Sequence, residues 1–193
     1  MPDTIFTIGH STHTLGTFAE LLERHGITAL CDVRSVPYSR MNPQFNRETL
    51  QGALAKSGIH YFFLGKELGA RPEDTSCYKN HQVQFDVFEK TALFQSGIDK
   101  VINISKEYHT ALMCAEKDPL SCHRTILVAR VLVKNGFTVE HILGDGSIEK
   151  HAQAQARLLK QLHLPETDMF KTKDEIIDEA YRKQAGMIAY KED

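Results

Sequence analysis

Short apolar runs alternate with longer amphipathic segments along the chain. Five runs have the length and the β-branched or aromatic content of strands. They cover residues 4–8, 27–33, 59–64, 110–114 and 137–143. The second run is almost continuously apolar apart from Asp32, which is typical of a strand buried in a parallel sheet.

Helical periodicity fills most of the segments between these runs. Apolar residues at helical spacing predict a helix over residues 14–25, and Gly26 follows it as a stop signal. Further helices are expected over 46–57 and 123–135, and in two pieces between 85 and 108 that separate near Gly97. Ser147 is expected to cap another helix, and residues 65–78 read as a loop.

This alternation predicts an α/β fold with a mostly parallel sheet of about five strands and helices on both faces. Residues 1–163 would form that domain. Residues 164–193 would form a connector and a C-terminal amphipathic helix, opened by the capping box Thr172-Lys173-Asp174-Glu175. That helix either packs back on the domain or joins two copies in a homodimer.

Composition excludes several classes of protein. The chain has 193 residues, with 23 Lys and Arg against 25 Asp and Glu. This near-neutral balance disfavours binding of nucleic acid by bulk charge, and no apolar run approaches the ~18 residues that a membrane span needs. The first eight residues lack the basic and apolar segments of a secretory signal. Four cysteines, two of them within predicted strands, indicate a reducing cytoplasm rather than a disulfide framework.

Polar or glycine-rich sequence follows each predicted strand. Because the carboxyl ends of parallel strands meet at one edge of the sheet, and ligands bind there, these segments predict a single site. Gly9, His10 and Ser11 follow the first strand. Gly9 permits close approach of another backbone, and His10 is a candidate acid or base.

The second strand ends in Asp32-Val33-Arg34, and Arg40 lies in the loop beyond it. Strand alternation places Asp32 and Arg34 on the same face. Arg34 and Arg40 together could bind a phosphate or carboxylate, and a buried Asp32–Arg34 pair is the equal alternative. Tyr61, in the third strand, is a further candidate ligand-binding residue.

The most specific segment runs from Cys114 to Arg124, between a strand and a helix. Cys122 lies near the start of the helix, where the helix dipole and Arg124 or a charged His123 would favour a thiolate. Cys122 or Cys114 could therefore act as a nucleophile, with His10 or Glu116 moving protons. His123 and Arg124 would help to bind the ligand.

Two other interpretations of this segment remain open. The cysteines could be structural, since free cysteine is often buried. Cys114, Cys122 and His123, with His10 as a fourth ligand, could instead bind a metal ion. The seven residues between the cysteines fit the two-to-four-residue spacing of structural zinc sites poorly, so metal is the least favoured interpretation.

Four motifs occur together in this chain: Ile8-Gly9-His10-Ser11, Asp32-Val33-Arg34-Ser35-Val36-Pro37, Leu64-Gly65 with Leu68-Gly69, and Cys114-Ala115-Glu116 through Cys122-His123-Arg124. Their combination, from about residue 5 to residue 143, resembles the domain-of-unknown-function 488 (DUF488) family. The resemblance implies a bacterial or archaeal cytosolic protein whose motifs form one site. It supplies no reaction and does not cover residues 147–193.

These observations favour an enzyme that acts on a small anionic or nucleotide-like substrate with a cysteine, histidine and arginine site. A module that binds nucleic acid or a modified base is one alternative, because Arg34, Arg40, Lys66 and Arg71 could form a local basic rim. A Cys/His metal protein is the other. The sequence does not identify a cofactor, and the expected partner is a small anionic ligand.

Overall fold

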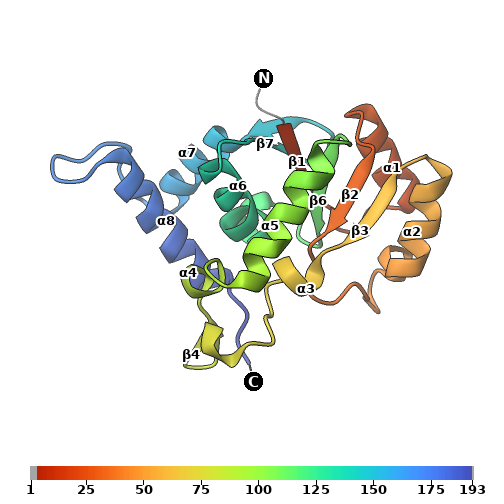
Figure 1. Cartoon of the computed structure of the whole chain (residues 1–193). Coiled ribbons are helices and arrows are strands. Elements are labelled where there is room, and N and C mark those ends of the chain that lie inside the picture. Colours follow the sequence, from red (N-terminus) through yellow and green to blue (C-terminus); the bar gives the residue numbers. More distant parts are fainter. Residues whose placement is uncertain (1–3, 193) are drawn as a thin grey trace.

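The computed structural model describes residues 4–192 (Figure 1). Residues 1–3, on which the expectation about a secretory signal partly rests, and residue 193 lie outside the described part. A six-stranded sheet forms the centre of the fold, in the order β3-β2-β6-β1-β7-β8. The bounds are β1 Thr4–Gly9, β2 Ala29–Asp32, β3 His60–Phe63, β6 Thr110–Cys114, β7 Thr138–Ile142 and β8 Ile148–Lys150.

The first five strands of this order are parallel, which confirms the predicted α/β class. The sixth, β8, pairs antiparallel with β7, where the sequence predicts a helix capped by Ser147. That prediction is wrong because a tight turn reverses the chain at Gly146, whose φ is 84°. Asp145 accepts hydrogen bonds from the Ser147 backbone and hydroxyl, so Ser147 stabilises the turn. The helix begins only at His151.

One face of the sheet packs against two helices near the N-terminus. Strand residues Leu30 and Met113 join a buried cluster with Phe18 and Leu50. Phe18 belongs to α1 (Leu15–Arg24), and Leu50 belongs to α2 (Arg47–Lys56). Thr14 caps α1 by accepting a hydrogen bond from the backbone of Thr17, and α2 begins after the 3₁₀ turn η1 (Pro43–Phe45).

The opposite face carries the larger core. Alternating strand residues such as Cys31, Leu112 and Cys114 point into it. Its helices are α5 Ala92–Ser105, α6 Arg130–Lys134, α7 His151–Gln161 and α8 Lys173–Ile188. Figure 1 shows these helices and α1 and α2 on opposite sides of the sheet. The predicted covering of both faces is therefore confirmed.

The segment between β3 and β6 contains more structure than the sequence predicts. The expected loop holds α3 (Gly65–Leu68), a 3₁₀ turn η2 (Thr75–Cys77) and a two-stranded ribbon of β4 (Tyr78–Lys79) and β5 (Gln82–Val83). After the ribbon, α4 (Phe85–Phe88) precedes α5.

The expected helix break near Gly97 is also wrong, since Gly97 lies inside α5. The break falls at Thr91, whose hydroxyl caps α5 by accepting from the Phe94 backbone. A Cβ atom at Gly97 would press on Glu67 and Leu68. Gly97 therefore allows α3 to pack closely on α5 and does not end a helix.

The helix after Cys122 begins as a π-helix, η4 (Arg124–Ala129), and continues as α6. Single π-turns of this kind are often found at functional sites. At the end of the chain, the capping box of Thr172 and Glu175 starts α8 as predicted. Helix α8 packs against α7 and the π-helix, and its Tyr181 is buried. Among residues 4–192, no helix is long and apolar enough to cross a membrane.

A chain of buried hydrogen bonds runs from β1 to α8. It links Thr7 Oγ1 to His141 Nδ1 (2.8 Å), His141 Nε2 to His151 Nδ1 (3.1 Å) and His151 Nε2 to the Tyr181 hydroxyl (2.8 Å). His151 is buried beneath α8, whose Tyr181 hydroxyl contacts it. Burial lowers the pKa of His141 to about 3 and that of His151 to about 4, so both are neutral near pH 7.

Candidate active site

A buried ion pair lies at the carboxyl end of β2. Arg34 donates to Asp32 from Nε (2.9 Å), from Nη2 (2.6 Å) and from its backbone N–H (3.1 Å). The Tyr61 hydroxyl donates to the same carboxylate at 2.7 Å. Since Asp32 is fully buried and Arg34 nearly so, this is a charge-assisted bidentate pair within the protein. The same-face placement of Asp32 and Arg34 agrees with the sequence prediction.

His10 completes this group by orienting Arg34. Its Nδ1 donates to the Ser11 carbonyl (2.9 Å), so Nε2 accepts from Arg34 Nη1 (3.3 Å). The ring stacks on Phe45 at 4.3 Å between centroids. Burial, with the nearby Arg34 charge, lowers the pKa of His10 to about 4. His10 is thus a neutral imidazole whose lone pair is already used.

Gly9 brings the end of β1 against the loop that follows β6. A Cβ atom at Gly9 would collide with the Glu116 carbonyl. The close approach lets His10 donate its backbone N–H to the Cys114 carbonyl, and Ser11 to the Ala115 carbonyl, both at 2.9 Å. Gly9 therefore permits close approach of another backbone segment, as predicted, and that segment is the loop containing Glu116. Ser11 contributes through its backbone, and its φ is 47°.

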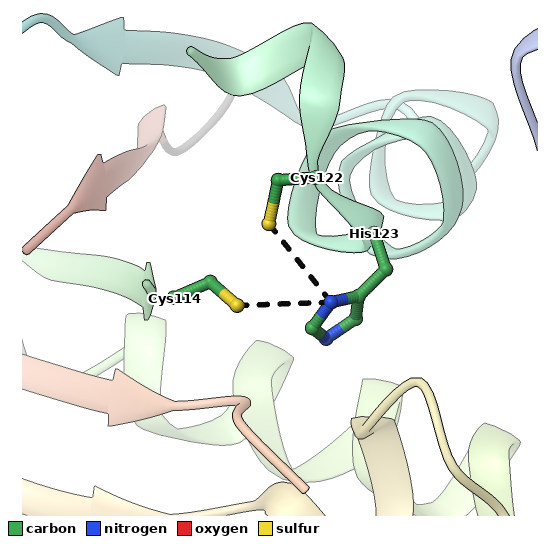
Figure 2. A group of neighbouring side chains, drawn as sticks. All are labelled: Cys114, Cys122 and His123. Atoms are coloured by element: carbon green, nitrogen blue, oxygen red, sulfur yellow. Dashed lines mark hydrogen bonds between the residues drawn. The ribbon is translucent and has the colours of Figure 1, made fainter. Parts of the chain in front are cut away.

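Two thiols and one imidazole form the second group of the site (Figure 2). His123 Nδ1 lies 3.7 Å from Cys114 Sγ and 3.9 Å from Cys122 Sγ. The other ring nitrogen, Nε2, donates to the Val33 carbonyl at 2.9 Å. Cys114 at the end of β6 and Cys122 just before the π-helix thus both contact the His123 ring, which is held by the Val33 carbonyl after β2. Figure 2 shows both sulfurs pointing toward the same ring atom.

The two thiols of this cluster have different acidities. The neighbouring Cys122 thiol, together with burial, raises the pKa of Cys114 well above its ordinary value. Burial opposes ionisation of Cys122, but the Cys114 thiol, the Arg124 charge and His123 together lower the pKa of Cys122. Burial works against the charged ring of His123, but contact with Cys122 raises its pKa. These shifts act in the direction of a negative charge on Cys122 and a positive charge on His123.

Arg124 holds the loop between the cysteines from inside the protein. Its side chain is fully buried and donates to the carbonyls of Glu116 (2.7 Å) and Lys117 (3.3 Å). Within residues 4–192, no carboxylate pairs with it, so its charge acts on the neighbouring thiols. Arg124 therefore positions the loop, and it does not line the pocket beside the cysteine cluster.

A pocket of about 270 Å³ opens beside the cysteine cluster. Its wall includes six residues with chemistry to offer: Arg34, Arg71, Cys114, Glu116, Ser121 and His123. Glu116 is exposed as a residue, but desolvation of its carboxyl group and the charge of Cys122 raise its pKa. Four of the site residues predicted from the sequence therefore line this pocket: Arg34, Cys114, Glu116 and His123.

The other candidates lie elsewhere. Eight candidates do not line this pocket: Gly9, His10, Ser11, Asp32, Arg40, Tyr61, Cys122 and Arg124. Arg40 is exposed and does not line the pocket, because the loop after β2 carries it away from Arg34. Arg34 and Arg40 therefore do not share this pocket.

Arg71 and Tyr190 line the wall, but neither is among the site residues selected from the sequence. Arg71, which reads as part of a solvated loop, stacks its guanidinium on the Tyr190 ring at 4.3 Å from the centroid. Tyr190 follows α8, and its carbonyl accepts a hydrogen bond from the Val83 backbone, which holds the C-terminal segment against the ribbon. No local motif marks this contact, since it joins residues 119 positions apart.

The fold and the site define an α/β protein with a buried cysteine–histidine cluster at the carboxyl ends of a parallel sheet. Residues 14–131, more than half of the chain, match the family described as a domain of unknown function, DUF488. The chain therefore belongs to the DUF488 family, as the resemblance indicates. No curated protein and no solved structure matches it.

Proposed function

We propose that the protein is an enzyme that acts on a small anionic substrate in the pocket at the carboxyl ends of β2 and β6. The observation that carries the proposal is the shared wall, on which Cys114, Glu116 and His123 face the same space as Arg34 and Arg71. Concave sites with a few convergent polar groups are the usual form of a small-molecule site.

Arg71 is the better anchor for the anionic group. Arg34 already donates four of its five side-chain N–H groups, to Asp32, Phe45 and His10. One N–H of Arg34 is left for a ligand. Arg71 is exposed, and its guanidinium is oriented by stacking on Tyr190 rather than by a carboxylate. Its full charge is therefore available to a phosphate or carboxylate.

The cysteine cluster supplies the reactive centre in this proposal. Cys114 and His123 line the pocket, while Cys122 is buried next to His123, with its Sγ 3.9 Å from His123 Nδ1. Glu116 is the carboxyl group on this part of the wall, and its position suits it to carry a proton between substrate and cluster. His10 has no free lone pair, which favours Glu116 of the two candidate proton carriers.

A pocket of this size favours a small molecule over a nucleic-acid strand. Tyr38 and Tyr61 do not line this pocket, so neither ring could stack a base bound there. The four basic residues suggested by the sequence do not form one rim around the pocket, since Arg40 does not line it. The binding-module alternative therefore has no observation in its favour.

The test combines anion binding with turnover. Calorimetric titration with inorganic phosphate and pyrophosphate should show binding that weakens about tenfold or more in Arg71→Gln, since a hydrogen bond to a charged group contributes about 1.5–3 kcal/mol. Arg40→Gln is the matched control and should bind as the unmodified chain does. Nitrophenyl esters of phosphate and of carboxylic acids then serve as turnover probes, with Glu116→Gln expected to be impaired. Equal anion binding by Arg71→Gln and Arg40→Gln would refute the proposal.

A further inference from the structure

We propose that Cys114, Cys122 and His123 bind one Zn²⁺ ion, whose remaining coordination position faces the pocket. The ion would be part of the reactive centre, and this role rests on the proposed function, whereas the binding of the ion does not. The three ligand atoms, two sulfurs and one nitrogen, lie within 4.8 Å of one another. Each of the three residues is buried.

Two of the three ligand separations are close to those of a tetrahedral zinc site. Zinc binds sulfur at about 2.3 Å and imidazole nitrogen at about 2.0–2.1 Å, so a regular tetrahedron places a sulfur and a nitrogen ligand about 3.6 Å apart. The observed separations from His123 Nδ1 are 3.7 Å and 3.9 Å. These separations are long for a strong hydrogen bond, but they match the edge of a coordination tetrahedron.

The surroundings of the three ligands are those of a metal site. A histidine that binds a metal usually donates its second ring N–H to a carbonyl or carboxylate, which fixes the ring. His123 does this through Nε2 and the Val33 carbonyl, leaving Nδ1 for the ion. The Arg124 backbone N–H donates to Cys122 Sγ at 3.4 Å, and such a bond supports a sulfur that carries negative charge.

The spacing of the cysteines does not oppose this assignment. The tight spacing of structural zinc sites arises because both cysteines come from one turn. Here one sulfur comes from the end of β6 and the other from the start of the π-helix, so the fold brings them together across the loop. His10, the fourth ligand suggested by the sequence, is bound to Ser11 and Arg34 and is not available.

Three protein ligands leave a position open, as in catalytic rather than structural zinc sites. Cys114 and His123 both line the pocket, so the open position is reached from the side of Arg71 and Glu116. A bound ion would polarise an oxygen of the substrate or of water there. Binding would release two protons: either both come from thiols, or one comes from a thiol and one from the charged imidazole.

The experiment uses the full chain, stripped of metal and titrated with Zn²⁺ and with Co²⁺. We expect one ion per chain, and the cobalt form should show thiolate-to-metal charge transfer and the intense visible bands of four-coordinate cobalt. Cys114→Ser should lose stoichiometric binding. Cys77→Ser, which changes a buried thiol outside the cluster, should keep it.

Circular dichroism shows whether each variant is folded. If Cys114→Ser does not fold, the cobalt absorption spectrum of the unmodified chain alone decides whether the cysteines bind the ion. Substoichiometric zinc, or cobalt bound without thiolate charge transfer, would overturn the inference. Arg71→Gln should still bind zinc. If the unmodified chain binds zinc but binds neither phosphate nor pyrophosphate, only the proposed function is refuted. Anion binding without metal would refute only the zinc site.

Discussion

Replacing Asp32 by Asn should destabilise the protein strongly, because it removes one partner of a buried ion pair. The carboxylate accepts hydrogen bonds from the Arg34 backbone, from Arg34 Nε and Nη2, and from the Tyr61 hydroxyl. An Asn side chain keeps one acceptor oxygen, and its amide nitrogen would face donors. The guanidinium would then be buried without a counter-charge.

The expected cost is about 3–5 kcal/mol, the range for breaking one side of a buried pair. With a urea dependence of about 2 kcal/mol per molar, the unfolding midpoint should fall by about 1.5–2.5 M. Thermal unfolding should shift down by ~6–20 °C for a chain of this length. Equilibrium urea unfolding followed by circular dichroism measures the change.

Two further variants show whether the loss arises from the buried charge. Asp32→Asn combined with Arg34→Met removes both charges and should recover part of the lost stability. Glu179→Gln disrupts exposed ion pairs with Lys171 and Lys183 and should change the urea midpoint little. If Asp32→Asn and Glu179→Gln unfold at the same urea concentration, the ion pair does not stabilise this end of the sheet as argued.

Two other predictions concern stability. His141 and His151 have folded-state pKa values of about 3 and about 4, below the ~6.5 of an unfolded histidine, so the unfolded state binds more protons between these values. Stability should therefore fall as the pH is lowered from about 6.5 to about 4. His151→Gln should reduce that slope by up to ~1.4 kcal/mol per pH unit in urea titrations; an unchanged slope would contradict the burial argument. Gly9→Ala should lower the urea midpoint, because its Cβ would meet the Glu116 carbonyl. Gly52→Ala, which has open space around it in α2, should instead gain about 0.5–1 kcal/mol of stability. Equal urea midpoints for the two variants would show that β1 tolerates separation from the loop.

The strands and most helices follow from local patterns, because their periodicity and caps lie within each segment. Errors arise where the same residue type serves a different tertiary purpose. Gly97 reads as a helix stop, but it permits the contact of α5 with α3. Ser147 reads as a helix cap, but Asp145 engages it in a turn that allows β8 to pair with β7.

The site was predictable where topology brings strand ends together. Asp32, Arg34, Cys114 and His123 lie at or just beyond the carboxyl ends of β2 and β6, and the rule for parallel sheets places them near one another. The sequence could not show that Arg124 would turn inward to the loop carbonyls, or that Arg71 would meet Tyr190. These contacts depend on how the loop and the C-terminal segment pack.

The central claim is that an anion binds in the pocket beside the cysteine–histidine cluster. Anomalous diffraction from crystals of the full chain soaked in tungstate, a heavy analogue of phosphate, tests this claim most directly. We expect a tungsten peak within hydrogen-bonding distance of the Arg71 guanidinium, on the side of the pocket lined by Cys114 and His123. Tungsten bound only at other surfaces, with none in this pocket, would contradict it.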